Sequence, residues 1–421
     1  MADEKKETQD GAEETQDGVD EICVGVMYAL LAITDDKKDT LKNVGKVMPW
    51  HIEALRVVTG SEEQAHKPLT MILNQDMGLH VDCIIDISGI TKGGHFLDTQ
   101  GFIAHNSEVI VLSYRCTTSA FDWLTNLNTT SSVWEIEEDL AQGYSGMCSG
   151  FEGLCCYNGE YRPRVHTGFY NNFLASLPLI KQHIEPLLGP NQPPRKLFVV
   201  GHSLGAGIAT LAGCYFLTEF DWTKMPQHLV NVTAGSPRAC CESMKPMIDK
   251  RREEMGSHAR IYRVVKGKDC VVNVPPKSFG FRHLVDPVRI TDVGEIVLHS
   301  SEVELDADIA DLTTKVAGSR QLVQDVEGDD TPAKYERIVV RIPKVLRDHM
   351  PDFYLKPLLK SRGVKHGSLR ECVSTYDSFL EPAGQIEQKG KSLPPRKQAK
   401  RIWLPKMFRK KKIQDTPGTY F

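Results

Sequence analysis

The sequence predicts an α/β fold with a mostly parallel central sheet flanked by helices, and two observations support this prediction. Apolar, β-branched segments alternate with helical segments through the middle of the chain, a pattern typical of parallel sheets. The clearest case is the segment 196–207, where an apolar run leads through a turn with two glycines into a small, apolar helical run. A strand, a sharp turn and a buried helix are therefore expected there.

Size and composition fit a soluble globular protein. The chain has 421 residues, of which 41% are hydrophobic and 25% are charged, so it can bury one large core or two smaller ones. The start of the chain lacks the apolar core of a secretory signal, and the apolar run 22–33 is too short to span a bilayer. Eleven cysteines, with no C-x-x-C pair, indicate a reducing compartment and no zinc site. We therefore expect a cytoplasmic protein that is not secreted and holds no metal.

Charge and composition divide the chain. Residues 1–21 carry nine acidic and two basic side chains and predict a disordered acidic tail. Residues 22–385 form the predicted globular domain, with a helical N-terminal extension over 22–90 and an exposed acidic insertion over 301–337. Residues 386–421 form a basic tail that contains aromatic residues.

The elements of the domain follow in order. A β-hairpin is expected over 95–114, and the segment 131–164 is predicted to be irregular. A long helix follows over 170–188, and then the strand, turn and helix around Ser203. Further strands are expected at 229–234, 259–265 and 290–297.

The turn Gly201–Gly205 has the sequence Gly-His-Ser-Leu-Gly, which in this setting predicts a nucleophile elbow. The turn is so sharp that side chains at both glycine positions would collide, and glycine removes the collision. Ser203 would then project alone at the carboxyl end of its strand. The alternative is a glycine-bounded turn with an idle serine.

A serine nucleophile needs a base, and the base needs a carboxylate to orient it. The order along such a chain is serine, acid, histidine. Asp269 is the best candidate acid because it follows the strand 259–265, and Asp286 and Asp292 are weaker candidates. The spacing leaves the histidine open among three candidates, which are His283, His299 and His349.

Two donors are expected for the oxyanion. One is the backbone N–H of Leu204, directly after the serine. The other comes from the end of the hairpin strand, where Thr117 offers both an N–H and a hydroxyl.

Two further segments have two interpretations each. The short helix 119–127 is either a surface helix that packs on the core or a mobile lid over an acyl-chain pocket, whose apolar residues are Phe121, Trp123, Leu124 and Leu127. The segment Lys391–Lys412, with ten basic and no acidic residues, is either a solvated tail or a peripheral anchor on anionic membranes. Nuclear targeting is a lesser alternative for this tail.

Several motifs, in order, resemble the class 3 lipases, a fungal-lipase-like family of α/β-hydrolases. They include Val109–Thr117 followed by Asp122–Leu127, then Val165–Phe169, Gly201–Gly205, Gly235–Arg238, Arg263–Val265 with Asp269, and Asp348-His349 with Tyr354. The resemblance covers about residues 90 to 360. It implies an α/β-hydrolase fold, with Ser203 as nucleophile, Asp269 as acid, His349 as base and Thr117 as oxyanion residue. It also favours the lid for 120–127, and the missing signal peptide points to the intracellular branch, with its diacylglycerol lipases and plant-type phospholipases.

The resemblance implies a serine lipase that cleaves acylglycerols, phospholipids or galactolipids, without a cofactor and without nucleic acid. Such a protein would work in the cytoplasm, on membranes or on lipid droplets. Cys116 stands where the family usually has glycine, beside Thr117, which puts the catalytic rate in doubt. This departure motivates a second hypothesis, a non-catalytic lipid-binding or scaffold protein. A third hypothesis keeps the triad and transfers acyl groups to an alcohol.

Overall fold

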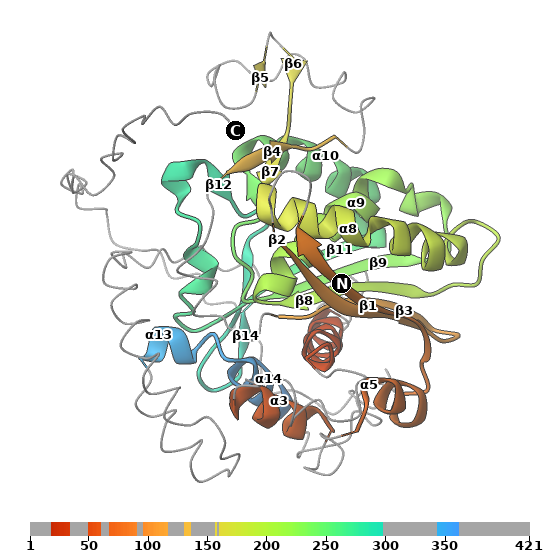
Figure 1. The fold of residues 1–421 in the computed structure, drawn as a ribbon, viewed down its shortest axis with the longest axis vertical. Coiled ribbons are helices and arrows are strands. Elements are labelled where there is room, and N and C mark those ends of the chain that lie inside the picture. Colours follow the sequence, from red (N-terminus) through yellow and green to blue (C-terminus); the bar gives the residue numbers. More distant parts are fainter. Residues whose placement is uncertain are drawn as a thin grey trace, which may run out of the picture. The chain divides into compact units, whose positions relative to one another are not determined.

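An eight-stranded sheet forms the centre of the described part of the chain (Figure 1). The computed structural model describes residues 18–33, 49–59, 67–90, 96–116, 130–135, 156–157, 160–297 and 343–361, all within the unit Met1–Ile386. The sheet has the order β1-β2-β3-β8-β9-β11-β13-β14. Its strands are β1 (His80–Ile90), β2 (Phe96–His105), β3 (Val109–Tyr114), β8 (Lys196–His202), β9 (His228–Ala234), β11 (Ala259–Lys266), β13 (Pro287–Ile290) and β14 (Ile296–Val297).

The middle of the sheet is parallel and its edges are antiparallel. β3, β8, β9, β11 and β13 pair in parallel with one another in that order. β1 and β2 extend one edge and β14 extends the other, each through antiparallel pairs. This arrangement confirms the predicted α/β fold, and it brings the carboxyl ends of β8, β9 and β11 side by side, where ligands bind in open α/β sheets.

Alternating side chains of the buried strands supply two separate cores. In β8, Phe198 and Val200 belong to one apolar cluster, while Leu197 and Val199 belong to the other. Because successive side chains of a strand point to opposite faces, a strand buried on both faces needs an unbroken apolar run. That is why β8 is apolar from Leu197 to Val200 with no polar alternation.

Three helices cover one face of the sheet (Figure 1). They are α8 (Thr167–His183), α9 (Leu204–Glu219) and α10 (Lys245–Met255). Small residues let α9 lie close to its neighbours: a Cβ on Gly207 would come within 2.5 Å of the Phe169 ring, and one on Gly213 within 2.6 Å of Asn231. The glycines of α9 therefore set the depth at which this helix packs.

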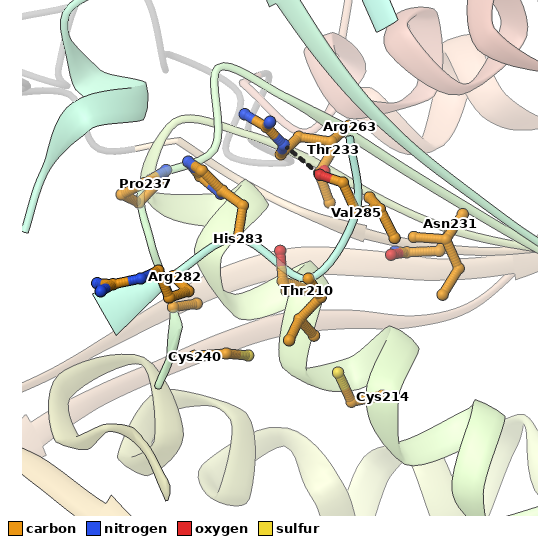
Figure 2. Close-up of a pocket in the computed structure, with 13 residues that line it drawn as sticks. Thr210, Cys214, Asn231, Thr233, Pro237, Cys240, Arg263, Arg282, His283 and Val285 are labelled. Carbon is orange, nitrogen blue, oxygen red and sulfur yellow. Dashed lines mark hydrogen bonds between the residues drawn. The ribbon is translucent and has the colours of Figure 1, made fainter. Parts of the chain in front are cut away.

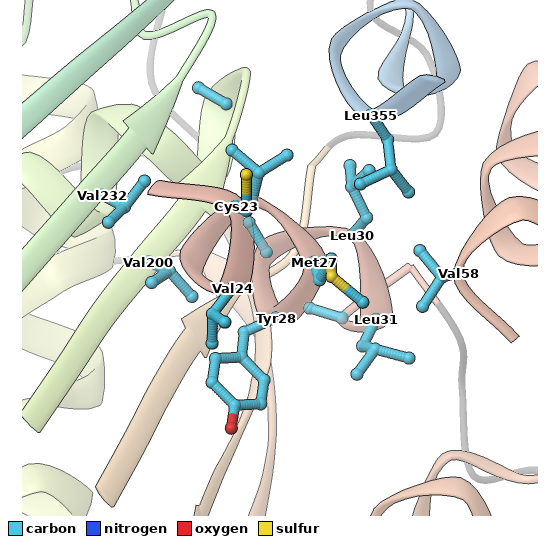
Figure 3. Packing of buried hydrophobic residues seen from close by; sticks show 14 of the residues in the cluster. Cys23, Val24, Met27, Tyr28, Leu30, Leu31, Val58, Val200, Val232 and Leu355 are labelled. Carbon is cyan, nitrogen blue, oxygen red and sulfur yellow. The ribbon is translucent and has the colours of Figure 1, made fainter. Parts of the chain in front are cut away.

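The opposite face is covered by the helix of residues 18–31, by α3 (Pro49–Thr59) and by α14 (Pro351–Ser361). The helix of residues 18–31 lies between the sheet and the other two helices, as Figure 3 shows for Val200 and Val232 on one side and Val58 and Leu355 on the other. Its residues from Ile22 onward are buried all round, as expected for a helix apolar on every side. Gly25 allows close approach, because a Cβ there would lie 2.5 Å from Val232.

Smaller elements complete the described chain. Residues 131–164, predicted to be irregular, contribute short strands to a four-stranded sheet of order β12-β10-β7-β4 and to the pair β5-β6. Among the described helices, none combines the length and the apolar character needed to cross a bilayer. The short elements are β4 (Ser131–Val133), β5 (Cys156–Tyr157), β6 (Glu160–Tyr161), β7 (Arg164–His166), β10 (Cys240–Cys241), β12 (Phe281–Arg282), α5 (Leu69–Met71), η1 (Ile72–Asp76), η2 (Glu185–Leu187), η3 (Trp222–Lys224), η4 (Glu242–Met244), η5 (Gly256–His258), η6 (Val271–Asn273), η7 (Lys277–Phe279) and α13 (Lys344–Arg347).

Three predicted boundaries were wrong. The acidic tail does not extend to residue 21, because residues 18–21 begin a helix in which Asp20 and Glu21 are buried. The N-terminal extension is not helical to residue 90, because β1 occupies 80–90 and pairs along its length with β2. The predicted strand 290–297 is the hairpin of β13 and β14, which turns through Gly294 at φ 93°.

Other predictions concern segments outside the described residues. These are the acidic insertion 301–337, the helix 119–127, the basic tail Lys391–Lys412 and most of the acidic tail. They stay predictions.

Candidate active site

Ser203 stands at a strained turn between β8 and α9. Its backbone has φ 56° and ψ −123°, and among the described residues it is the non-glycine residue with a positive φ. The flanking glycines are required, since a Cβ on Gly201 would lie 2.3 Å from the carbonyl oxygen of Gly205, and one on Gly205 would lie 2.3 Å from that of Tyr114. Strain of this kind persists where the surrounding structure enforces it, often at functional sites. The turn therefore has the geometry of a nucleophile elbow.

His349 reaches Ser203 from a distant part of the chain. The Oγ hydroxyl of Ser203 donates to Nε2 of His349 over 2.8 Å. His349 follows the short helix α13, whose Val345 carbonyl accepts a hydrogen bond from the N–H of Cys270 at 3.2 Å. The histidine that spacing left open is thus the one that the structure brings to the elbow.

Asp269 completes a line of hydrogen bonds. Nδ1–H of His349 donates to Oδ2 of Asp269 over 2.9 Å, and the hydroxyl of Tyr354 donates to the same oxygen over 2.5 Å. The N–H of Val271 donates to Oδ1 over 2.8 Å. Asp269 is 1% exposed, so its carboxylate has lost its hydrating water. These three donors take the place of that water.

Neighbouring loops fix the pair of Asp269 and His349. Gly235, which follows β9 with φ 59°, leaves no room for a side chain, because a Cβ there would lie 2.9 Å from Oδ2 of Asp269 and 3.0 Å from Nδ1 of His349. The buried carboxylate of Asp348 accepts a hydrogen bond from the N–H of Lys268 over 2.8 Å. This bond ties the loop of the acid directly to the segment of the histidine.

The weaker acid candidates lie elsewhere. Asp286 is exposed. Asp292 is paired with the ammonium groups of Lys266 at 2.6 Å and Lys344 at 3.0 Å, and these two hydrogen bonds lower its pKa to about 2. Neither is in hydrogen-bond contact with a histidine in the described structure.

The other histidine candidates are likewise not at the elbow. Nε2–H of His283 donates to the carbonyl of Val272 over 2.7 Å, so this residue supports the loop after Asp269. Burial and the charge of Arg263 hold the pKa of His283 well below its ordinary value. His299 lies outside the described residues.

The expected oxyanion donors are placed only in part. Leu204 is the first residue of α9, so its N–H is one of the free donors at a helix N-terminus. The chain that leaves β3 passes close to this turn, since a Cβ on Gly205 would lie 2.7 Å from the carbonyl oxygen of Arg115. Thr117 itself, and the lid residues Phe121, Trp123, Leu124 and Leu127, lie outside the described residues.

Cys116 precedes Thr117, and its side chain lies in the apolar cluster beneath the sheet. It is 5% exposed and shares that cluster with the helix of residues 18–31. Burial raises the pKa of its thiol to about 11, so it is not a thiolate at neutral pH.

A pocket lies on the α9 face of the sheet. Figure 2 shows Thr210 and Cys214 of α9 and Asn231 of β9 on one side, with Arg263 and His283 on the other. Its lining contains none of Ser203, Asp269 and His349. The three hydrogen-bonded residues are themselves buried, with Ser203 2%, Asp269 1% and His349 7% exposed.

Sequence reasoning missed three features of the site. They are the hydrogen bond from Tyr354 to Asp269, the close approach of Gly235 and the contact of His202 with His349. Gly235 had a signal, because a glycine directly after a buried strand often marks a close backbone approach. Tyr354 of α14 meets Asp269 in the loop after β11, and His202 of β8 meets His349 between α13 and α14, so only the tertiary fold brings these partners together.

Comparisons with known proteins find sequence similarity to lipases. Residues 111–279 match the family model described as lipase (class 3). Over 174 residues the chain is 30% identical to a secreted mono- and diacylglycerol lipase of Fusarium solani, covering 41% of this chain and 41% of the relative. Over 171 residues it is 26% identical to the chloroplastic phospholipase A(1) DAD1 of Arabidopsis thaliana, covering 39% of this chain and 33% of the relative. The chain thus spans less than half the length of these relatives.

The crystal structure of a mono- and diacylglycerol lipase from Aspergillus oryzae is also similar. The match has 22% sequence identity and a TM-score of 0.39, and covers 63% of this chain and 77% of that one.

Proposed function

We propose that the protein is a serine carboxylic-ester hydrolase that removes acyl chains from glycerolipids, and the match of residues 111–279 to the class 3 lipase model supports this proposal. The observation that carries the proposal is the continuous line of hydrogen bonds from Ser203 through His349 to Asp269. A base within reach of a hydroxyl, itself oriented by a carboxylate, is the arrangement that activates a serine.

In the proposed mechanism, Oγ of Ser203 attacks the ester carbonyl carbon while Nε2 of His349 takes the hydroxyl proton. Asp269 holds the imidazole by Nδ1 and stabilises the imidazolium that forms. The N–H of Leu204 and the N–H and hydroxyl of Thr117 would stabilise the oxyanion. The C–O bond then breaks, and the leaving alcohol takes its proton from His349.

The second half of the cycle regenerates the serine. Water attacks the acyl-enzyme and gives its proton to His349, and the tetrahedral intermediate collapses to release the carboxylic acid and return the proton to Ser203. Because Oγ is buried in this structure, an ester can reach it only after neighbouring atoms move. The helix 119–127 stays the predicted lid.

The names of the relatives support a substrate class. The Fusarium relative is named for mono- and diacylglycerols and the Arabidopsis relative for phospholipids. We propose acylglycerols or polar glycerolipids, including galactolipids, as the substrates of this chain.

We also propose a cytoplasmic location with peripheral contact at membranes or lipid droplets through Lys391–Lys412. Seven of the described cysteines are not joined in disulfides, which is in keeping with a reducing compartment. The basic residues of the tail would add about 1 kcal/mol each near an anionic surface.

The non-catalytic alternative receives no support from the described geometry. It was motivated by Cys116, but that side chain packs in the apolar core, and the hydroxyl of Ser203 is hydrogen-bonded to His349.

A lipid-class panel tests the proposal. Wild type should release fatty acid from at least one of triacylglycerol, diacylglycerol, phospholipid and galactolipid, and Ser203→Ala should abolish the release. Ser113→Ala is the matched control, because Ser113 is also a buried serine but donates to a carbonyl of the helix 18–31. Adding an acceptor alcohol separates acyl transfer from hydrolysis. If folded wild type releases no acyl group from any class, the proposal is wrong.

A further inference from the structure

His202 is a buried histidine beside the proposed nucleophile that the mechanism above does not use. It is the last residue of β8 and directly precedes Ser203. It is 2% exposed. Since an imidazole loses hydration when it is buried, its polar atoms need partners inside the protein.

The imidazole of His202 contacts His349 in two ways. Nε2–H of His202 donates to the backbone carbonyl oxygen of His349 over 3.0 Å. The two rings also stack, with centroids 4.9 Å apart and an angle of 26° between their planes. The ring of Tyr354 closes another side, edge-on at 5.5 Å. His202 is therefore enclosed by residues of the proposed triad and by the tyrosine that supports the triad.

The direction of the hydrogen bond fixes the tautomer of His202. A carbonyl oxygen can only accept, so Nε2 of His202 must carry its proton. A neutral His202 meets this requirement without adding a second positive charge. This matters because His349 becomes an imidazolium during the proposed reaction, in face-to-face contact with the His202 ring.

His349 depends on contacts of this kind for its position. Its segment, 343–361, follows residues 298–342, which the structure does not describe. Two hydrogen bonds from the acid loop hold earlier residues of the segment, namely Val345 and Asp348. The hydrogen bond from His202 differs from these two, because it holds the main chain of His349 itself. It also comes from β8, the strand that leads into Ser203.

We propose that His202 is a positioning residue, which holds the main chain of His349 through its Nε2–H and thereby keeps the imidazole of His349 between Ser203 and Asp269. The inference rests on the proposed function for its catalytic meaning. The position of the His349 imidazole, which the inference concerns directly, can be measured without a substrate. Small displacements are costly in such a site, since an error of about 1 Å can lower a rate on the order of 100-fold.

Two substitutions distinguish the role of the Nε2–H donor of His202 from the role of its ring. His202→Gln keeps an amide N–H near the position of Nε2 but removes the ring. His202→Phe keeps the ring but removes the donor. We expect His202→Gln to retain kcat for a soluble short-chain ester within about threefold of wild type, and His202→Phe to lower kcat on the order of tenfold or more with KM unchanged.

A spectroscopic readout accompanies the kinetics. The proton on Nδ1 of His349, shared with Asp269, should give a downfield proton resonance that vanishes in His349→Ala. We expect this resonance at its wild-type position in His202→Gln, and shifted or broadened in His202→Phe. Melting temperatures of all variants show whether a loss of rate merely follows a loss of stability.

The inference fails if His202→Phe keeps wild-type kcat and the same resonance, or if His202→Gln loses as much as His202→Phe. If His202→Phe does not fold, His202→Asn replaces it, because its shorter amide cannot reach the carbonyl of His349. In that case equal rates for Asn and Gln overturn the proposal. If wild type has no esterase activity but the resonance responds as expected, the proposed function is wrong and the positioning role stands.

Discussion

The carboxylate of Asp269 is a buried charge whose oxygens are both hydrogen-bonded. Oδ2 accepts from His349 and Tyr354, and Oδ1 accepts from the backbone of Val271. The hydroxyl of Tyr354 is fully buried, and burial together with the charge of Asp269 raises the pKa of Tyr354 well above its ordinary value. The tyrosine is therefore protonated at neutral pH and donates to Asp269.

Replacing Tyr354 by phenylalanine should destabilise the protein by about 1.5–3 kcal/mol, because hydrogen bonds to charged groups are the strong ones. The matched control is Tyr114→Phe. Tyr114 is equally buried, but its hydroxyl pairs with the neutral hydroxyl of Ser176, so its loss should cost only about 0.5–1.5 kcal/mol. Urea unfolding of both variants measures the difference. Equal losses would mean that the hydrogen bond from Tyr354 to the Asp269 carboxylate contributes no more than one between neutral groups.

His283 should make stability depend on pH. Its pKa in the folded protein is well below the ordinary value of 6.5, because of burial first and of the charges of Arg263, Arg238 and Lys277 next. The unfolded chain therefore binds a proton near pH 6.5 that the folded chain does not bind. Stability is thus full above pH 6.5 and falls as the pH drops below it.

The measurement is urea unfolding between pH 7.5 and 5 for wild type and His283→Gln. Within the window below pH 6.5, the contribution of His283 to the slope approaches about 1.4 kcal/mol per pH unit. His283→Gln can keep the hydrogen bond to Val272 but cannot titrate, so its slope should be smaller by that amount. An unchanged slope would show that His283 does not titrate differently in the two states.

At the scale of elements, the site is assembled by the loops that follow three neighbouring parallel strands. β8 leads into Ser203, β9 into Gly235 and β11 into the loop of Asp269. These strands could be predicted from sequence because each is rich in apolar and β-branched residues and is followed closely by a glycine. The paths of the loops could not, since they depend on contacts such as the bond between Lys268 and Asp348, 80 residues apart.

Gly235→Ala should lower activity far more than stability alone explains. Its Cβ would lie 2.9 Å from Asp269 and 3.0 Å from His349, so the triad must move. The matched control is Gly256→Ala, which has a similar φ of 53° but nothing within 4 Å of the added Cβ. Both substitutions strain the backbone by about 1 kcal/mol or more.

We expect only Gly235→Ala to lower kcat for a soluble ester, on the order of 100-fold. Steady-state kinetics on both variants, with melting temperatures alongside, measures this. If Gly256→Ala loses as much activity as Gly235→Ala, the loss comes from backbone strain and not from a displaced Asp269 and His349.

Two elements differ from the sequence prediction for physical reasons. β1 is rich in β-branched residues, including Val81, Ile84 and Ile85, a strand signal that the helical interpretation of 22–90 overlooked. The segment 290–297 was expected to be one strand, but Gly294 with its positive φ allows the chain to reverse between β13 and β14.

At the scale of the whole molecule, the sheet is sealed by a separate apolar cluster on each face. The helix of residues 18–31 supplies much of one cluster, and its start corrects the predicted acidic tail. Glu21 is buried because it pairs with Lys196 at 2.8 Å and with Arg260 at 3.1 Å, and accepts a hydrogen bond from Tyr262. Composition alone counted Glu21 with the solvated acids, since its partners lie more than 170 residues away.

The fold class and the grouping of Ser203, Asp269 and His349 could be predicted because their signals are local or ordered along the chain. The Gly201–Gly205 motif is local, and the order of Asp269 and His349 after it follows the family resemblance. The supporting contacts of Tyr354, His202 and Asp348 could not be predicted. Each joins the segment 343–361 to β8 or to the loop after β11, and only the packing of the folded chain brings these parts within reach of one another.

The most direct test of the account is the site of reaction with a fluorophosphonate probe, which labels activated serines. Wild type should take up one probe per chain, and peptide mapping should place it on Ser203. Ser203→Ala should take up none, and His349→Ala should label far more slowly because its serine has lost the base. Well-folded wild type that is not labelled, or that is labelled on another serine, would contradict the account.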